Sequence, residues 1–181
     1  MILYVAVAVL LISGAAVLVT LLRGSIEHPS NLSELLDRLQ PVNIASFRHL
    51  ASDTDDRYLR QNLSVLEYVK LRSSRLKTIQ SYYLSAFRNC SILLSYGELL
   101  SNSEHRLFAE FGRELSSSAM ELRLALLRAI AGVCLCYLVP VGVPLWREIT
   151  DSYSLLGSRL SHFSESNFPD LQPAIIDQFW L

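Results

Sequence analysis

The first stretch of the chain carries the feature that most constrains its fold. No side chain is charged between residues 2 and 22, and these 21 residues would rise about 31 Å as a helix, which matches the hydrocarbon core of a bilayer. A cleaved signal peptide has a basic region before an apolar run of about 7 to 15 residues. Nothing basic precedes this run. We therefore expect residues 1–23 to be a retained transmembrane anchor, of the signal-anchor kind, that binds the lipid bilayer through residues 2–22.

The charges that follow the apolar run suggest the side of the membrane on which the rest of the chain lies. Arg23 is the first of them, and basic residues beside a span favour the cytoplasmic side. Glu27 and Glu34 follow closely and weaken this signal. The sequence predicts a single-pass membrane protein with a cytoplasmic body.

Residues 24–63 are expected to form short helices and connectors. Asn31 with Glu34 three positions later resembles a capping box, which opens a helix that Pro41 ends. A second short helix is expected over residues 44–51. The acidic cluster that follows, Asp53, Asp55 and Asp56, lacks the glycine and glutamate of a calcium-binding loop, and acids are typical of a helix N-terminus.

Residues 64–165 are expected to form a helical bundle built on a long antiparallel hairpin. Ser64 with Glu67 makes a second capping box. Apolar residues then recur at spacings of three and four, which is the helical period. Ser103, after a short turn, is expected to cap the second helix of the hairpin. The first helix should bury Val69, Leu76, Ile79, Tyr83, Ala86, Cys90, Leu93 and Leu100, and the second Leu107, Phe111, Leu115, Leu122, Leu126 and Ile130.

A second apolar stretch leaves the topology open. Residues 129–146 carry no charge over 18 positions, which is the lower limit of a membrane span. Pro140 and Pro144 would break a helix in its last third. We favour a buried core helix ending near Val139 over a second crossing.

The C-terminal part is expected to hold one more amphipathic helix and then a tail. Leu155, Leu156, Leu160 and Phe163 are the apolar positions of that helix. Residues 166–181 should be irregular because of Pro169 and Pro173, and they end in apolar residues that should dock on the domain or on the membrane interface.

Charge is unevenly distributed along the chain, although the net charge is only −1. Seven basic residues lie between Arg57 and Arg88 against one acidic residue, Glu67. Lys70, Lys77 and Arg88 fall within about 20° of one another on a helix, opposite the apolar seam. They form a candidate interaction face for anionic lipid or an acidic protein partner, and a solvated face paired with the acidic C-terminal region is the alternative. With so small a net charge, nucleic acid is not an expected partner.

No catalytic, metal or cofactor motif is present in the sequence. The four histidines are isolated, and the chain has no phosphate-binding glycine-rich loop and no nucleophile elbow. The three cysteines, Cys90, Cys134 and Cys136, are typical of buried thiols. We expect no cofactor.

The sequence therefore predicts an all-α fold, with an N-terminal transmembrane helix followed by a helical bundle. Its biochemical role is expected to be that of a protein-interaction or membrane-surface-interaction module rather than an enzyme. The alternative is a small-molecule or lipid-binding bundle, enzymatic or not, with a pocket lined by Arg72, Tyr83, Phe87 and Phe111.

Overall fold

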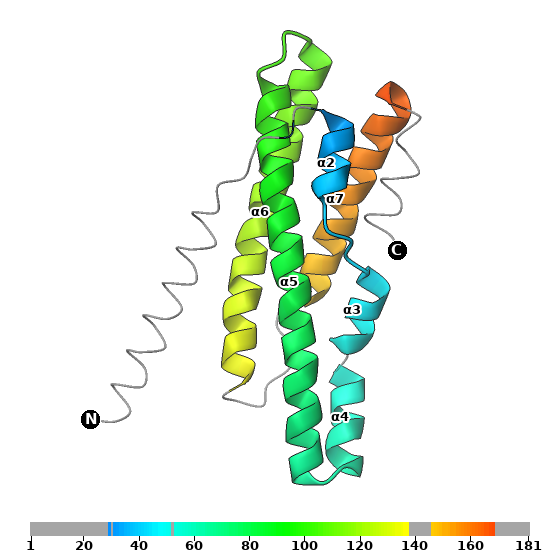
Figure 1. Ribbon diagram of the computed structural model, residues 1–181, viewed down its shortest axis with the longest axis vertical. Coiled ribbons are helices and arrows are strands. Elements are labelled where there is room, and N and C mark those ends of the chain that lie inside the picture. Colours follow the sequence, from blue (N-terminus) through cyan, green and yellow to red (C-terminus); the bar gives the residue numbers. More distant parts are fainter. Residues whose placement is uncertain (1–28, 30, 52, 138–145, 169–181) are drawn as a thin grey trace, which may run out of the picture.

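The computed structural model describes residues 29, 31–51, 53–137 and 146–168, and this part of the chain is a bundle of helices without strands (Figure 1). The helices are α2 (Leu32–Arg38), α3 (Ile44–Leu50), α4 (Asp53–Asn62), α5 (Val65–Ser101), α6 (Arg106–Cys136) and α7 (Trp146–Asn167). The all-α prediction is confirmed for these residues.

The expected membrane anchor, residues 1–23, lies outside the described residues. Within the described ranges, no helix combines the length and apolar character needed to cross a membrane. The irregular tail expected over residues 166–181 is described only at its start, where α7 continues to Asn167.

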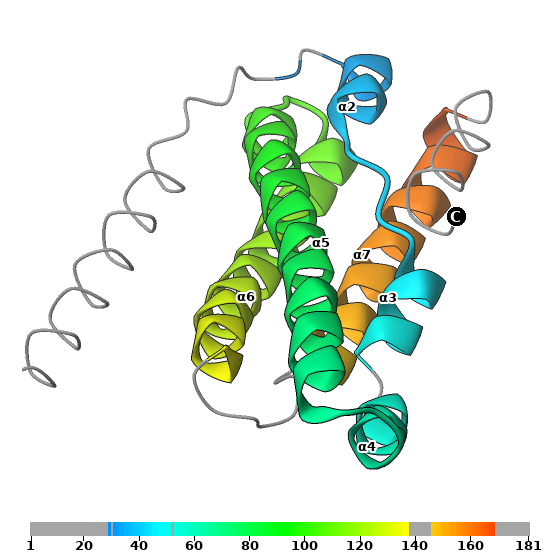
Figure 2. The same cartoon turned by 60° about the horizontal axis from the view of Figure 1, so that its bottom comes forward.

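The bundle is organised by the pair α5 and α6, which are 37 and 31 residues long. They are antiparallel: Gly97 of α5 meets Gly112 near the start of α6, and Arg72 reaches Cys136 at its end. Helix α7 packs on α6 and is joined to α5 by a hydrogen bond from Asn89 to Tyr153. Figure 2 shows α2 and α3 following α5 on the side of α7, with α4 at the lower end. Leucines of α2 share one apolar core with the three long helices.

The capping residues at the helix starts were predicted only in part. Ser64 and Glu67 form the expected capping box of α5, and Asn31 caps α2 by accepting from the Glu34 amide. The prediction for Ser103 is wrong. Helix α6 begins at Arg106, with His105 at the N-cap and no side-chain cap, while the Ser103 hydroxyl accepts from the His105 amide at 3.3 Å.

The buried residues follow the predicted seams through the middle of the hairpin. Leu100 and Phe111 are only half-buried against the core. The clear exceptions are Val69, Leu107 and Leu155, which are 57%, 77% and 54% exposed. Val69 lies before the part of α5 that α6 covers, and Leu107 lies in the first turn of α6. Leu155 lies about 100° around α7 from the buried Leu156, and its side chain faces away from the core.

The second apolar stretch packs in the core as far as the structure describes it. Ala129, Val133 and Cys136 are buried on α6, at most 2% exposed. Residues 129–136 therefore belong to the bundle. The predicted end near Val139 lies outside the described residues.

The two long helices come into backbone contact where Gly97 and Gly112 face each other. A Cβ atom on Gly97 would lie 2.9 Å from the Gly112 carbonyl oxygen and closer still to the Ser116 hydroxyl. A Cβ atom on Gly112 would lie 2.6 Å from the Gly97 carbonyl oxygen and 2.5 Å from the Ser101 amide nitrogen. Because each added Cβ atom would crowd backbone atoms as well as a side chain, a side-chain rotation alone cannot relieve the clash.

Replacing either glycine with alanine is expected to destabilise the bundle. Alanine in a helix interior normally stabilises by about 1 kcal/mol relative to glycine, but here overpacking should reverse the sign and cost about 1–3 kcal/mol net. Thermal unfolding of Gly97→Ala and Gly112→Ala, followed by circular dichroism, measures the effect.

Ser116 supplies a control for the glycine variants. Its hydroxyl is buried and has no hydrogen-bond partner among the described residues, so Ser116→Ala alone should be neutral or stabilising. Added to Gly97→Ala, it should recover part of the loss, because the hydroxyl is one of the crowded atoms. It should recover nothing for Gly112→Ala. Stabilisation by both glycine variants would contradict the close contact.

Asn89 ties the connector between α2 and α3 to the long helices. Its side chain is fully buried. The Nδ2 group donates to the Gln40 carbonyl at 2.7 Å and to the Tyr153 hydroxyl at 2.7 Å, while Oδ1 accepts from the Gln40 amide at 2.9 Å. Burial raises the pKa of the Tyr153 phenol, which keeps the hydroxyl protonated. One side chain thus satisfies both backbone groups of Gln40.

Replacing Asn89 with alanine should cost about 2–4 kcal/mol of unfolding free energy, since three hydrogen bonds are lost in a buried site. Tyr153→Phe removes only one of these hydrogen bonds and should cost about 1 kcal/mol. Chemical denaturation of the two variants beside the wild type measures both values. Equal losses would show that Asn89 does not hold the connector.

Candidate functional site

The lower end of the bundle in Figure 1 is built from the turn between α4 and α5 and from the end of α6. Because α5 is longer than α6, its first two turns extend beyond Cys136. Five apolar residues here are exposed, and we call them the tip. The tip consists of Val65, Leu66, Val69, Leu135 and Tyr137, which are 78%, 84%, 57%, 61% and 44% exposed.

Arg72 holds three elements together directly above the tip. Its guanidinium forms an ion pair with Asp56 of α4 at 3.2 Å and donates to the Tyr68 hydroxyl at 3.1 Å. The Tyr68 hydroxyl donates in turn to Asp56. The same guanidinium donates to the Cys136 carbonyl at 3.3 Å. A helix leaves its last carbonyls without partners, so Arg72 acts as a cap for α6.

An open hollow of about 540 Å³ lies beside Arg72. Its wall is largely apolar, and two arginines contribute the cationic groups. The lining residues are Arg60, Leu63, Val65, Tyr68, Val69, Arg72, Ser73, Leu76, Cys136 and Tyr137. The hollow therefore joins the apolar surface of the tip to the Arg72 guanidinium.

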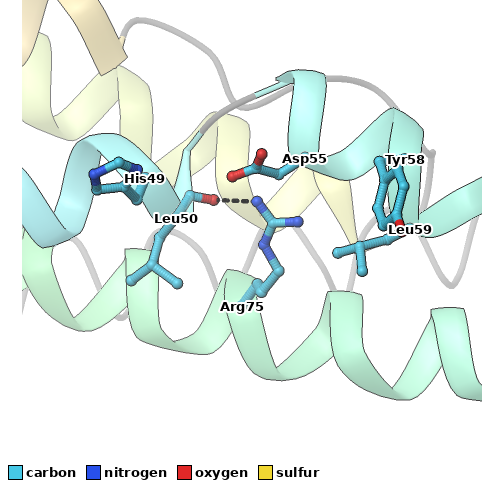
Figure 3. A pocket seen from close by; sticks show the side chains of 6 residues that line it. All are labelled: His49, Leu50, Asp55, Tyr58, Leu59 and Arg75. Atoms are coloured by element: carbon cyan, nitrogen blue, oxygen red, sulfur yellow. Dashed lines mark hydrogen bonds between the residues drawn. The ribbon is translucent and has the colours of Figure 1, made fainter.

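A second hollow, of about 380 Å³, lies next to α4 (Figure 3). Leu50 is the last residue of α3, and its carbonyl accepts a hydrogen bond of 2.8 Å from Arg75 of α5. His49 comes from α3, while Asp55 and Tyr58 come from α4 (Figure 3). Arg72 and Arg75 lie on the apolar side of α5, where a charge needs a partner. The structure gives both arginines helix-end carbonyls.

The predicted basic face lies on the exposed side of α5. Lys70, Lys77 and Arg88 are all exposed, and the first and last are 18 positions apart, which is about 27 Å of helix. No acidic residue in the described part of the chain forms an ion pair with any of the three. We call these three residues the basic line.

The residues of the predicted pocket are not gathered around one cavity. Tyr83 and Phe87 are each 1% exposed and belong to the core. The Arg123 guanidinium lies 4.7 Å from the centre of the Phe87 ring. Phe111 stacks on Phe163 with ring centres 3.8 Å apart, beside a different hollow of about 420 Å³. Arg72 lies at the other end of the bundle.

The cysteines are only partly as predicted. Cys90 and Cys136 are buried, and burial raises the pKa of the Cys90 thiol to about 12. The prediction that Cys134 is buried is wrong: it is exposed on α6. The described residues contain no group of three or more histidine, cysteine or acidic side chains placed to hold a metal ion.

Sequence reasoning missed the tip as a surface. The helical period places Val69 in the core, yet its side chain is exposed. The available signal was the position of Val65, Leu66 and Val69 in the first turns of α5, directly after the exposed cap Ser64.

Comparisons of the chain with protein families, curated proteins and solved structures found no match.

Replacing Arg72 with methionine should destabilise the lower end of the bundle by about 1–3 kcal/mol, because the Asp56 carboxylate loses its ion pair and the Cys136 carbonyl loses a hydrogen bond, while the apolar stem of the side chain is kept. Asp56→Asn keeps a hydrogen-bond acceptor and should cost less than about 1 kcal/mol. Unfolding free energies measure the global effect, and hydrogen exchange of the α4 amides measures the local one. Unchanged exchange in α4 would contradict the role of Arg72.

Proposed function

We propose that the protein is a membrane-anchored interaction module, in which residues 2–22 cross the bilayer and the helical bundle, on the cytoplasmic side, binds an acidic surface through the basic line. The observation that carries the proposal is the line itself. It places three exposed cations along about 27 Å of one helix and joins them to no acid in the described structure.

The basic line has no evident role in folding. Its side chains point away from the seam that α5 buries against α6, whereas the cations that hold the fold, Arg72 and Arg75, lie on the other side of α5. A surface that presents one sign of charge attracts and orients a partner of the opposite sign. The anchor would increase this effect by holding the domain close to partners on the same membrane.

The alternative is a solvated face paired with the acidic C-terminal region, and no ion pair among the described residues supports it. Glu148, Asp151 and Glu165 are exposed on α7, and none of them forms an ion pair with the basic line in the described structure. Asp170 and Asp177 lie outside the described residues.

A second candidate function is binding of a small amphiphile. The hollow beside Arg72 favours it, because its apolar wall and two arginines suit an acyl chain with an anionic head. Arg72 already binds Asp56, Tyr68 and Cys136, which leaves Arg60 as the main cation for such a ligand. We therefore place this candidate second.

Reversing the basic line, with Lys70→Glu, Lys77→Glu and Arg88→Glu together, should weaken binding to acidic surfaces by about a hundredfold, since each basic residue near an anionic surface contributes about 1 kcal/mol. The full chain, held in phosphatidylcholine nanodiscs, would be tested against vesicles containing phosphatidylserine and against poly-glutamate. Circular dichroism should show an unchanged fold.

A triple reversal elsewhere serves as the matched control. Arg106, Arg113 and Arg128 are exposed on α6, and reversing them changes the net charge by the same amount. Binding should fall much less than for the basic line. If the two triple variants bind equally well, the basic line is only a solvated surface.

A further inference from the structure

We propose that the acidic surface bound by the basic line is an anionic lipid bilayer. The bundle lies along this membrane, and the tip enters the headgroup region. This inference rests on the proposed function and adds the identity of the partner and the way in which the domain is oriented on it.

The tip is the first reason. Val65 and Leu66 are more than three-quarters exposed at the start of α5, where a polar side chain would serve the fold equally well. Clustered apolar side chains on a surface usually mark a contact with a protein or a membrane. Tyr137 belongs to the same end, and nearby on α4 Tyr58 is 65% exposed. Tyrosines are enriched where a protein meets the headgroup layer.

The charges around the tip are the second reason. Arg57 and Arg60 are exposed on α4, and Lys70 and Lys77 are exposed on the first half of α5. Long basic side chains beside an apolar patch suit anionic headgroups, because the apolar group enters the membrane while the cations remain at its surface. A set of cations spread along one straight helix fits an extended charged plane better than a compact site on a folded protein.

The position of the anchor is the third reason. Nine residues lie between Leu22 and Leu32, so the ten steps of this link span at most about 36 Å. Helix α2 lies beside the upper part of α5, and the tip is at the opposite end of the bundle (Figure 1). Asn89 binds the connector after α2, and the distance along α5 from Asn89 to the start of the helix is about 36 Å. Helix α2 begins farther from the tip than this connector does (Figure 1), so even a fully extended link is too short for a bundle that stands upright on the tip. A bundle that lies along the bilayer brings both ends to it and lays the basic line along the headgroups.

Depth-dependent quenching in the full chain tests the inference. A solvent-sensitive fluorophore would be attached through Leu66→Cys, and in a matched variant through Leu107→Cys, which is 77% exposed at the other end of the bundle. Both variants carry Cys134→Ser to remove the exposed native thiol. The chains are reconstituted in phosphatidylcholine vesicles with and without phosphatidylserine, and a nitroxide-labelled lipid is the quencher.

We expect quenching to be several-fold stronger at position 66 than at position 107, and only when phosphatidylserine is present. Equal quenching at the two positions, or none at position 66, would overturn the inference. A blue-shifted but unquenched label at position 66 would also overturn it, because a protein partner or a second copy would then cover the tip.

The same experiment separates this inference from the proposed function. If the basic line binds poly-glutamate but the label at position 66 is not quenched, the proposed function stands and the bilayer inference fails. If quenching at position 66 persists after reversal of Lys70, Lys77 and Arg88, membrane contact stands and the proposed role of the basic line fails. Loss of quenching on reversal supports both.

Discussion

The contact between Gly97 and Gly112 is the constraint on which the rest of the structure depends. It lets the backbones of α5 and α6 meet near their connecting turn, and it thereby fixes how the two helices are aligned along their length. With the alignment fixed there, the shorter helix ends at Cys136, opposite Arg72. The first seven residues of α5 are left without a partner on α6. The exposed tip is thus a direct consequence of two unequal helices aligned at their other end.

Polar side chains of α5 hold the remaining elements on this hairpin by binding backbone groups. Asn89 binds both backbone groups of Gln40, Arg75 binds the last carbonyl of α3, and Arg72 binds the last carbonyl of α6. Helix ends and connectors are where a chain has backbone groups without partners of their own. The short helices therefore depend on α5 for their polar contacts as well as for their apolar ones.

Periodicity and capping predicted the helices because both act locally. The capping box at Ser64 and the seam from Leu76 to Leu93 involve residues within a few turns of one another, and the sequence is sufficient to find them. Val69 and Leu107 fit the same period yet are exposed, because the period of one helix does not reveal where its partner ends. Gln40, which Asn89 binds, is 49 residues away, and Cys136, which Arg72 binds, is 64 residues away. The four residues of the predicted pocket share apolar character, which does not place them around one cavity.

The two sets of cations on α5 differ in a way that follows from their chemistry. The inner pair is arginine in both cases, and a guanidinium with several donors in a fixed plane can bind a carboxylate, a hydroxyl and a carbonyl at once, as Arg72 does. The basic line contains both lysines of the chain, Lys70 and Lys77, whose compact ammonium groups are strongly hydrated and suit a solvated or headgroup surface. The inner cations are committed to the fold. The outer ones are not, and for this reason a change in the outer set reports on binding rather than on stability.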